Sequence, residues 1–322
     1  MIRGLVIGKF LPVHRGHLTL ISFAARQCDE VIVSLSDADN DPIEVSLRLS
    51  WLRELTSPWP NVKVFSIKDD FDQPDLPLQT RTKTWAAVIK KTYGQIDKVF
   101  SSEEYGEPFA KNLGAIHVEF DRGRELIPVS ASMIRQHPFR YWDFIPEVVR
   151  PYFVKRICFY GPESTGKSTA AIKMAERYDT LSVPEVAREM IVTNDFTVDD
   201  IIRIGKAQTE RVLEYTKHAN KLLFCDTDVI VTQIYSRHYL GVVPEILFDL
   251  EKQVRYEKYF FFDIDTPWAE DGLRDLGHRR EEMRNIFLNE LVKRKIEPVF
   301  VRGSFEERDQ IIIKAIGSLL TQ

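Results

Sequence analysis

The chain has 322 residues, of which 44% are hydrophobic and 29% charged, and its formal net charge is −4. This length exceeds one average domain, and the composition excludes a disordered chain. The acidic balance argues against a protein that coats nucleic acid, because such binding needs a basic footprint. No apolar run reaches the ~18 residues that span a bilayer, and no signal-peptide pattern is present. Three dispersed cysteines suit a reducing compartment, so we expect a soluble cytoplasmic protein without a membrane partner.

The first half of the chain alternates apolar runs with stretches of helical spacing. We expect strands at 3–8, 30–36, 62–67, 98–101 and 115–120, and helices at about 18–26, 45–55, 81–93 and 105–112. Such alternation predicts a parallel sheet with helices on both faces. Ligands of these sheets collect at the carboxyl ends of the strands, beside the first strand.

Two histidines follow the first expected strand. His14 and His17 are three residues apart at the start of a helix, near its positive end, where an anion is favoured. Gly16 between them would let a phosphate approach the backbone closely. The pattern therefore predicts an anion site at this point of the sheet.

The same segment carries a family resemblance. Gly8-Lys-Phe-Leu-Pro-Val-His-Arg-Gly-His17 resembles the G-x-F-x-P-x-H-x-G-H signature of the nucleotidylyltransferase superfamily. Val129-Ser-Ala-Ser-Met-Ile-Arg135 resembles its second signature, I-S-x-T-x-I-R, with Val for the first Ile and Ser132 for Thr. The resemblance implies a Rossmann-like fold. It also implies an enzyme that transfers an adenylyl group from ATP to a phosphate monoester and releases pyrophosphate. Catalysis then needs positioning and charge neutralisation rather than a covalent intermediate.

The resemblance also assigns roles to the matched residues. His14 and His17 would hold the ATP phosphates, with Lys9 adding a further charge or remaining a solvated loop lysine. Ser132 and Arg135 would grip the departing pyrophosphate. Further ATP contacts are expected from Gly8, Phe10 and Gly16.

The Ile-Arg ending of the second signature resembles the nicotinamide-mononucleotide branch of the superfamily. Trp85 is then either a platform for the cationic nicotinamide ring or a packed structural tryptophan. Arg81, one helical turn earlier, either meets the substrate phosphate or faces solvent. An aromatic, proline-rich stretch at 139–152 follows and is expected to form a packed linker. We place the domains at 1–150 and 151–322.

The second half begins with Gly161-Pro-Glu-Ser-Thr-Gly-Lys-Ser168, a complete phosphate loop. A strand-like run precedes it and a helix-compatible run follows, as the motif requires. Its glycines turn backbone N–H groups onto an anion at the positive end of the helix. Lys167 would reach the β- and γ-phosphates of ATP, and Ser168 would ligate Mg²⁺. The expected ATP-binding residues are Gly161, Glu163, Ser164, Thr165, Gly166, Lys167, Ser168 and Thr169.

Strands expected at 181–184, 221–228, 259–264 and 297–301 complete an α/β domain of the P-loop kinase type, with a long helix at 199–219. Asp226 and Asp228 would hold Mg²⁺, and Glu185 would accept the proton of an attacking hydroxyl. Arg188 would position substrate or phosphate. For each acid the alternative is a helix N-cap or a surface carboxylate.

A glycine-punctuated loop at 268–280 is dense in arginine. It is expected either to close as a lid, with its arginines on the transferring phosphates, or to be a solvated charge run. Trp268 and Asp271 are assigned to the acceptor site. The lid arginines are Arg274, Arg279 and Arg280.

Both halves together resemble the NadR-type bifunctional family. The resemblance implies that the second half phosphorylates nicotinamide riboside with ATP and Mg²⁺, and that the first half adenylylates the resulting nicotinamide mononucleotide to NAD. Two alternatives stay open: an adenylyltransferase–kinase fusion of coenzyme A synthesis, and a nucleotide-sensing regulator with weak catalysis. Some relatives begin with a DNA-binding helix-turn-helix. This sequence starts in its first strand, so we expect no DNA partner and leave homo-oligomerisation open.

Overall fold

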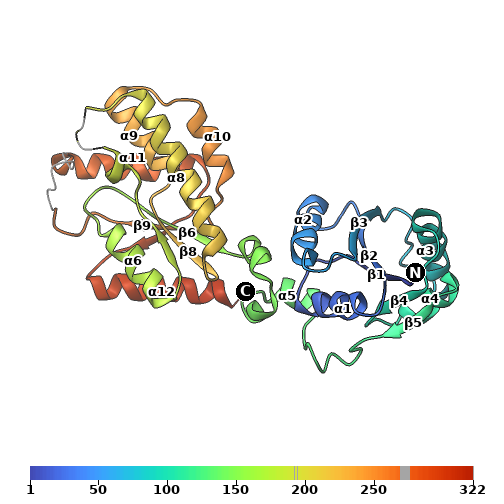
Figure 1. The fold of residues 1–322 in the computed structure, drawn as a ribbon. Helices are drawn as coiled ribbons and strands as arrows, with labels where there is room; N and C mark the ends of the chain where they lie inside the picture. The colour runs from blue at the N-terminus through green and yellow to red at the C-terminus, as the bar shows by residue number, and fades with distance from the viewer. Residues whose placement is uncertain (192, 194, 269–275, 322) are drawn as a thin grey trace. The chain divides into compact units, whose positions relative to one another are not determined.

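The computed structural model describes residues 1–191, 193, 195–268 and 276–321. The chain forms two compact units, Met1–Val149 and Arg150–Gln322 (Figure 1). Each unit holds its own five-stranded sheet, and every strand pair in both sheets is parallel. None of the helices in these ranges is long and apolar enough to cross a membrane. The expected fold class is confirmed.

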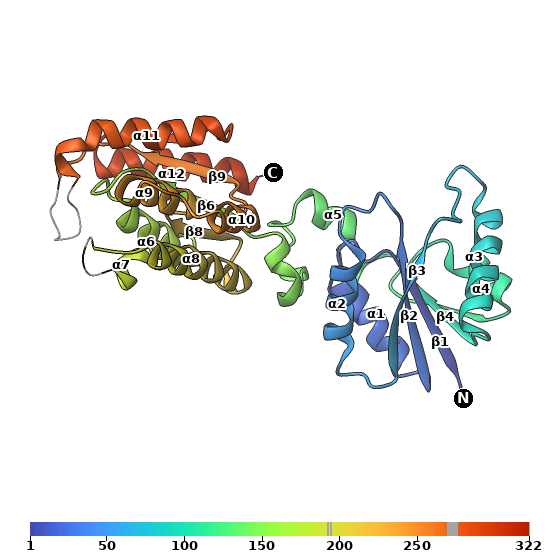
Figure 2. The same cartoon turned by 90° about the horizontal axis from the view of Figure 1, so that it is seen from above.

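The first unit has the strand order β3-β2-β1-β4-β5. Helices α1 and α2 cover one face of this sheet and α3 and α4 the other (Figure 2). The core between the sheet and helices α3 and α4 consists of apolar side chains. Successive strand residues alternate between the two faces, so only some residues of each strand point into this core. The elements are β1 (Arg3–Gly8), α1 (Arg15–Ala25), β2 (Glu30–Asp37), α2 (Val45–Thr56), β3 (Val62–Lys68), α3 (Leu78–Tyr93), β4 (Lys98–Ser101), α4 (Gly106–Leu113), β5 (Ile116–Glu119) and α5 (Ala131–Gln136).

Two 3-10 helices follow, η1 (Trp142–Phe144) and η2 (Glu147–Tyr152), in the stretch expected to be a packed linker. The side chains of Phe139, Trp142, Ile145 and Val149 are all buried there.

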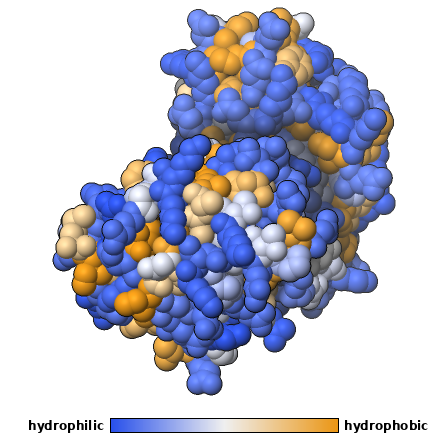
Figure 3. Space-filling view, turned by 90° about the vertical axis from the view of Figure 1, so that its right-hand side faces the viewer, coloured by the Kyte–Doolittle hydropathy of each residue, from blue (hydrophilic) through white to orange (hydrophobic). Residues whose placement is uncertain are grey.

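The surface seen in Figure 3 is largely hydrophilic, with small and separated apolar groups.

The second unit has the strand order β10-β9-β6-β8-β7. Helices α6 and α12 pack on one face of the sheet, and α9 and α11 pack on the other. The alternation within β6 produces this division, because Phe159 belongs to the first core and Tyr160 to the second. The elements are β6 (Lys155–Tyr160), α6 (Lys167–Arg177), β7 (Leu181–Val183), α7 (Ala187–Met190), α8 (Val198–His218), β8 (Leu222–Asp226), α9 (Val229–Leu240), α10 (Ile246–Gln253), β9 (Lys258–Phe262), η3 (Gly277–Arg279), α11 (Arg280–Lys293), β10 (Val299–Val301) and α12 (Phe305–Leu320).

Several expected bounds are corrected, each for a local reason. The helix expected at 81–93 begins at Leu78, directly after Pro77, whose fixed φ suits a helix start. The strand expected from 297 begins at Val299, because Pro298 has no N–H to give to a ladder. The strand expected to run to 228 ends at Asp226, because Thr227 takes a left-handed φ of 71°.

Candidate active sites

The first site is built around the start of α1. His14 is the N-cap residue of this helix, and its Nδ1 accepts a hydrogen bond from the Gly16 N–H at 3.1 Å. The His14 N–H in turn donates to Nδ1 of His17 at 3.3 Å. Because both Nδ1 atoms accept, each neutral ring carries its proton on Nε2. A Cβ on Gly16 would lie 2.9 Å from Cε1 of His14, so a larger residue would push against the capping ring. Glycine also leaves the backbone here open to a ligand.

Both imidazoles are neutral at physiological pH. Burial, followed by the nearby Arg124 cation, lowers the pKa of His14 to about 4. Burial also holds the pKa of His17 well below its usual value, with His14 and Arg124 adding to the effect. The pair therefore offers hydrogen-bond donors, and the positive charge of the site comes from other side chains.

These shifts predict how the stability of the first unit depends on pH. An unfolded histidine titrates near 6.5, so between pH 6.5 and about 4 the unfolded chain binds a proton that folded His14 does not. Stability is therefore lost as the pH falls through this window, by about 2 kcal/mol at pH 5 from His14 alone. Urea unfolding at pH 7 and pH 5 should show a smaller decrease for His14→Asn than for the unchanged chain. An equal decrease in both would contradict the assignment, and the exposed His137→Asn should behave as the unchanged chain.

A cavity of about 470 Å³ joins the two signatures. It is lined by His14 and His17 of the first signature and by Ser132 and Arg135 of the second. The Arg135 guanidinium donates to Ser132 Oγ at 3.2 Å and to the Leu11 carbonyl at 2.5 Å. The structure thus brings together residues more than 100 positions apart. Gly8, Lys9, Phe10 and Gly16 also line this cavity.

Sequence reasoning missed Arg124, which lines the same cavity and pairs with Glu103 at 3.0 Å. The only local signal was the basic run Arg122-Gly-Arg124 ahead of the second signature. Lys9 lies at the cavity edge and pairs with Asp41 at 3.2 Å, so it is not simply solvated.

A second cavity of about 190 Å³ adjoins the first and contains Trp85, Arg81 and Asp72. The guanidinium of Arg81 donates to both carboxylate oxygens of Asp72, at 2.8 and 2.6 Å. The indole Nε1 of Trp85 donates to the same carboxylate at 3.1 Å. Arg81 is therefore an ion-paired residue rather than one that faces solvent. Trp85 is half-buried against Tyr105, which leaves it within reach of a ligand in the cavity.

The second site is the phosphate loop between β6 and α6. Gly161 has a φ of 138°, and a Cβ there would lie 2.6 Å from the Phe262 carbonyl, so only glycine fits. Gly166 caps α6 with a φ of 87°. The Lys167 ammonium is buried and donates to the Pro162 carbonyl within the loop at 2.7 Å. Burial lowers its pKa because the charged ammonium loses solvation, a cost that an anionic partner would offset.

Further hydrogen bonds to its backbone carbonyls fix the shape of the loop. Thr165 Oγ donates to the Pro162 carbonyl, and the buried Arg308 donates to the Thr165 carbonyl at 2.7 Å. Thr266 Oγ donates to the Ser164 carbonyl at 3.0 Å. Thr169 lies exposed in the first turn of α6. These bonds hold the loop open in the shape that the motif requires.

Asp226 fits a magnesium site together with Ser168. Burial, and then the neighbouring Glu185, raises the pKa of Asp226 to about 6, while Lys167 and a hydrogen bond with Ser168 oppose this rise. Its Oδ1 is shielded from solvent and has no hydrogen-bond partner among the described residues. No cluster of three or more histidine, cysteine or acidic side chains suited to a metal occurs in the described parts of the chain. Mg²⁺ beside a nucleotide needs only one or two carboxylates, and Asp226 supplies one while Ser168 offers a hydroxyl.

The assignment of Asp228 to the metal is corrected. Its Oδ1 caps α9 by accepting the Val231 N–H at 3.2 Å, and its Oδ2 accepts the Tyr259 hydroxyl at 2.8 Å. The left-handed turn at Thr227 separates the two acids, so they do not share one side of the strand end. Asp228 is thus the helix N-cap that the sequence left as the alternative.

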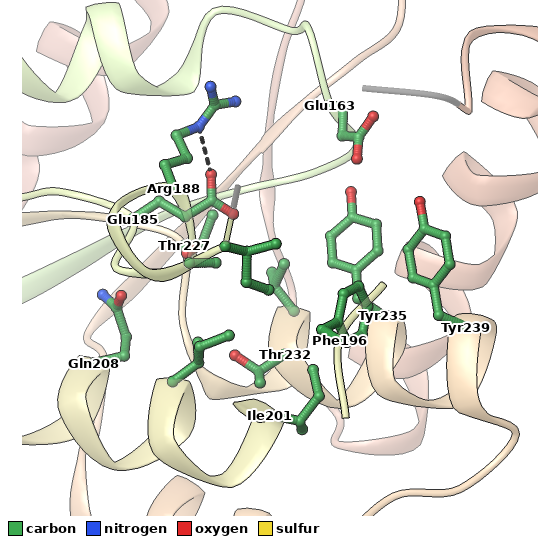
Figure 4. Close-up of a pocket in the computed structure, with 14 residues that line it drawn as sticks. Glu163, Glu185, Arg188, Phe196, Ile201, Gln208, Thr227, Thr232, Tyr235 and Tyr239 are labelled. Carbon is green, nitrogen blue, oxygen red and sulfur yellow. Dashed lines mark hydrogen bonds and ion pairs between the residues drawn. The ribbon is translucent and has the colours of Figure 1, made fainter. Parts of the chain in front are cut away.

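A pocket beside the phosphate loop holds Glu185, whose carboxylate pairs with Arg188 at 2.9 Å. Aromatic side chains that sequence reasoning missed form much of its wall. Figure 4 shows the Tyr235 hydroxyl pointing toward Glu163, with Tyr239 alongside. The only available signal was the spacing of the two tyrosines, which are one turn apart on α9. The aromatic lining comprises Phe196, Tyr235 and Tyr239.

The expected lid residues are only partly described. Asp271 and Arg274 lie outside the described residues. Arg279 pairs with Glu282, and Arg280 donates to the Thr266 carbonyl at 2.8 Å. Trp268 contacts Arg280, whose guanidinium carbon lies 5.7 Å from its ring, and is not among the described residues that line the pocket. Among the described residues, the aromatic lining of this pocket therefore comes from the tyrosines and Phe196 rather than from Trp268.

Comparisons with known proteins find a matching family for each half of the chain. Residues 5–137 match the Cytidylyltransferase-like family, and residues 156–308 match the AAA domain family. The chain is 31% identical to the trifunctional NAD biosynthesis/regulator protein NadR of Escherichia coli over 338 aligned residues, covering 97% of this chain and 81% of that protein. The chain belongs to the NadR family.

Other members of the NadR family support the same alignment. The NadR protein of Salmonella typhimurium is 31% identical over 93% of this chain and 78% of its own length. A NadR crystal structure in complex with NR shares the fold, with a TM-score of 0.80 and 24% identity over 98% of this chain and 95% of that one. A second NadR structure, in complex with NAD and AMP-PNP, also has a TM-score of 0.80 and 24% identity, over 100% of this chain and 96% of that chain. The expected family resemblance is confirmed.

Proposed function

We propose that this chain makes NAD from nicotinamide riboside in two steps, each using ATP. The second unit phosphorylates the riboside to nicotinamide mononucleotide, and the first unit adenylylates this product with release of pyrophosphate. One observation carries the proposal: a chain related to NadR over 97% of its length keeps both phosphate-handling sites. The same family membership disfavours the coenzyme A alternative.

For adenylyl transfer, the phosphate of the mononucleotide attacks the α-phosphate of ATP, and the bond from the α- to the β-phosphate breaks. Nε2–H groups of His14 and His17 hold the ATP phosphates as neutral donors, since neither ring takes up a second proton at neutral pH. Arg135, fixed by Ser132 and the Leu11 carbonyl, balances the charge that develops on pyrophosphate. These donors are in place before reaction, so the transition state requires little reorganisation.

For phosphoryl transfer, Lys167 exchanges its bond to the Pro162 carbonyl for the β- and γ-phosphates of ATP. Ser168 and Asp226 would hold Mg²⁺, which supplies charge neutralisation between the phosphates when bound. Glu185, oriented by Arg188, accepts the proton of the riboside hydroxyl. The tyrosine rings on α9 face the cationic nicotinamide ring, which suits their negative π-faces.

A time course of the purified full chain tests the proposal. With Mg²⁺, ATP and nicotinamide riboside, chromatography should show the mononucleotide first and NAD second. Phosphopantetheine, supplied in place of the mononucleotide, should give no product. NAD that forms only from added mononucleotide would remove the kinase step, and the mononucleotide without NAD would remove the transferase step.

Trp85 is proposed as the ring platform of the transferase site. Trp85→Ala is expected to raise the KM for nicotinamide mononucleotide at least about tenfold, because a desolvated cation–π contact is worth about 2 kcal/mol. The KM for ATP should stay within about twofold. Initial-rate kinetics with each substrate varied in turn measure this, and equal changes in both constants would make Trp85 structural.

We also propose a cytoplasmic location, where ATP is available and where Cys28, Cys158 and Cys225 remain reduced, as they are here. With a net charge of −4, DNA is not among the proposed partners. Size-exclusion chromatography with light scattering would decide whether chains associate.

A further inference from the structure

The cavity that holds Trp85 contains a second acid, Asp69, which has no role so far. Asp69 directly follows β3, and its N–H donates to the Asp37 carbonyl at the end of β2 at 2.7 Å. It therefore lies at the carboxyl edge of the parallel sheet, on the side where ligands of such folds bind. Its side chain lines the same cavity as Trp85 and Asp72.

The charge of Asp69 has no direct ion-pair contact, unlike the other charges of this cavity, although the Arg81 cation acts on it from a longer distance. Asp72 is paired with Arg81, and Lys9 is paired with Asp41. For Asp69, no ion pair to a residue within the described ranges is found. Its Oδ2 accepts the Ser36 hydroxyl at 2.5 Å, which is a neutral partner.

The second oxygen of Asp69 lacks even a neutral partner. Oδ1 is shielded from water and accepts no hydrogen bond from any residue that the structure describes. A shielded acceptor without a donor is costly, so it favours a ligand that supplies an N–H or O–H. The last torsion of an aspartate is soft, so the carboxylate of Asp69 can turn to meet a donor in the cavity that it lines.

We propose that Asp69 determines specificity in the transferase site by reading the carboxamide of the nicotinamide ring. This inference rests on the proposed adenylyl transfer to nicotinamide mononucleotide. The carboxamide NH₂ donates to Oδ1, while the positive ring lies over Trp85 and near the Asp69 carboxylate. Nicotinic acid mononucleotide instead places a carboxylate against Asp69, so two acceptors of like charge face each other without a proton between them.

The test compares the two mononucleotides as substrates of the full chain, with ATP and Mg²⁺, by the rate of pyrophosphate release. The unchanged chain should prefer the nicotinamide substrate by at least about 100-fold in kcat/KM, as expected for a site built around a substrate N–H. Asp69→Asn keeps an acceptor for Ser36 and adds an NH₂ that can donate to a carboxylate. It should lower the preference at least about tenfold, mainly through a higher kcat/KM for the nicotinic acid substrate.

Two matched variants separate this role from general charge effects. Asp70→Asn removes the neighbouring exposed acid and should leave the preference unchanged. Asp72→Asn removes a charge from the same cavity but loosens Trp85, so it should weaken both substrates alike. The urea unfolding transition of each variant reports whether the first unit is folded, because the kinase site lies in the other unit.

The outcomes distinguish the inference from the function on which it rests. An unchanged preference in Asp69→Asn, or an equal loss of preference in Asp72→Asn, overturns the role of Asp69. A chain that uses both mononucleotides equally also overturns it while leaving adenylyl transfer intact. A chain that makes a dinucleotide from neither substrate refutes the transferase function itself.

Discussion

Replacing Lys167 by alanine is expected to lower the rate of riboside phosphorylation at least about 1000-fold, equivalent to about 4 kcal/mol of transition-state stabilisation. The reason is geometric, because this ammonium is buried at the start of α6 and is held for the transferring phosphate. NAD formation from added mononucleotide should stay within about twofold, since that site belongs to the other compact unit. Coupled kinase and pyrophosphate assays on one preparation measure both rates.

Lys173→Ala is the matched control for this variant. Lys173 lies on the same helix but is exposed and pairs with Asp309, and a surface pair of this kind contributes at most about 1 kcal/mol. It should keep both activities. A Lys167→Ala enzyme that retains more than a tenth of the kinase rate would show that the phosphate loop is not the kinase site.

Replacing His17 by alanine is expected to have the opposite pattern. Adenylyl transfer should fall about 100- to 1000-fold, the usual cost of removing one donor to a developing charge. The loss should include His14 function as well, because the His14 N–H bonds to Nδ1 of His17. With nicotinamide riboside and ATP, the variant should therefore accumulate nicotinamide mononucleotide.

His137→Ala supplies the control, since this exposed histidine follows α5 and lies outside the cavity lining. It should form NAD at the unchanged rate. The urea unfolding transition of His17→Ala, compared with that of the unchanged chain, reports whether the first unit is folded. If NAD forms from the mononucleotide at more than a tenth of the normal rate, the histidines do not carry the transferase chemistry.

Contiguous motifs were predictable because their chemistry is local. Gly161 must adopt a positive φ next to a backbone carbonyl, and a phosphate loop in sequence states this requirement directly. His14 caps the helix that begins one residue later, so its place follows from adjacent residues. The alternation of strands and helices likewise predicted both parallel sheets, since burial on two faces leaves an apolar run in each strand.

Contacts between distant segments were decided only by the fold. Asp226 and Asp228 have the same chemistry and similar positions in sequence, and a single left-handed residue between them sends one to Ser168 and the other to the cap of α9. Arg81 could not be assigned from sequence, because its partner Asp72 comes from the loop before α3.

The sequence by itself therefore determined the fold class, the family and the places of the two phosphate-binding motifs in the fold, because glycine geometry and helix starts are set by neighbouring residues. Only the tertiary structure decided which acids are paired, which aromatic rings line the pocket beside the phosphate loop, and that Asp69 keeps an oxygen without a hydrogen-bond partner in the cavity of Trp85. Ion pairing and burial depend on which side chains meet in space. The same residue can be paired or unpaired, and buried or exposed, until the fold places its neighbours.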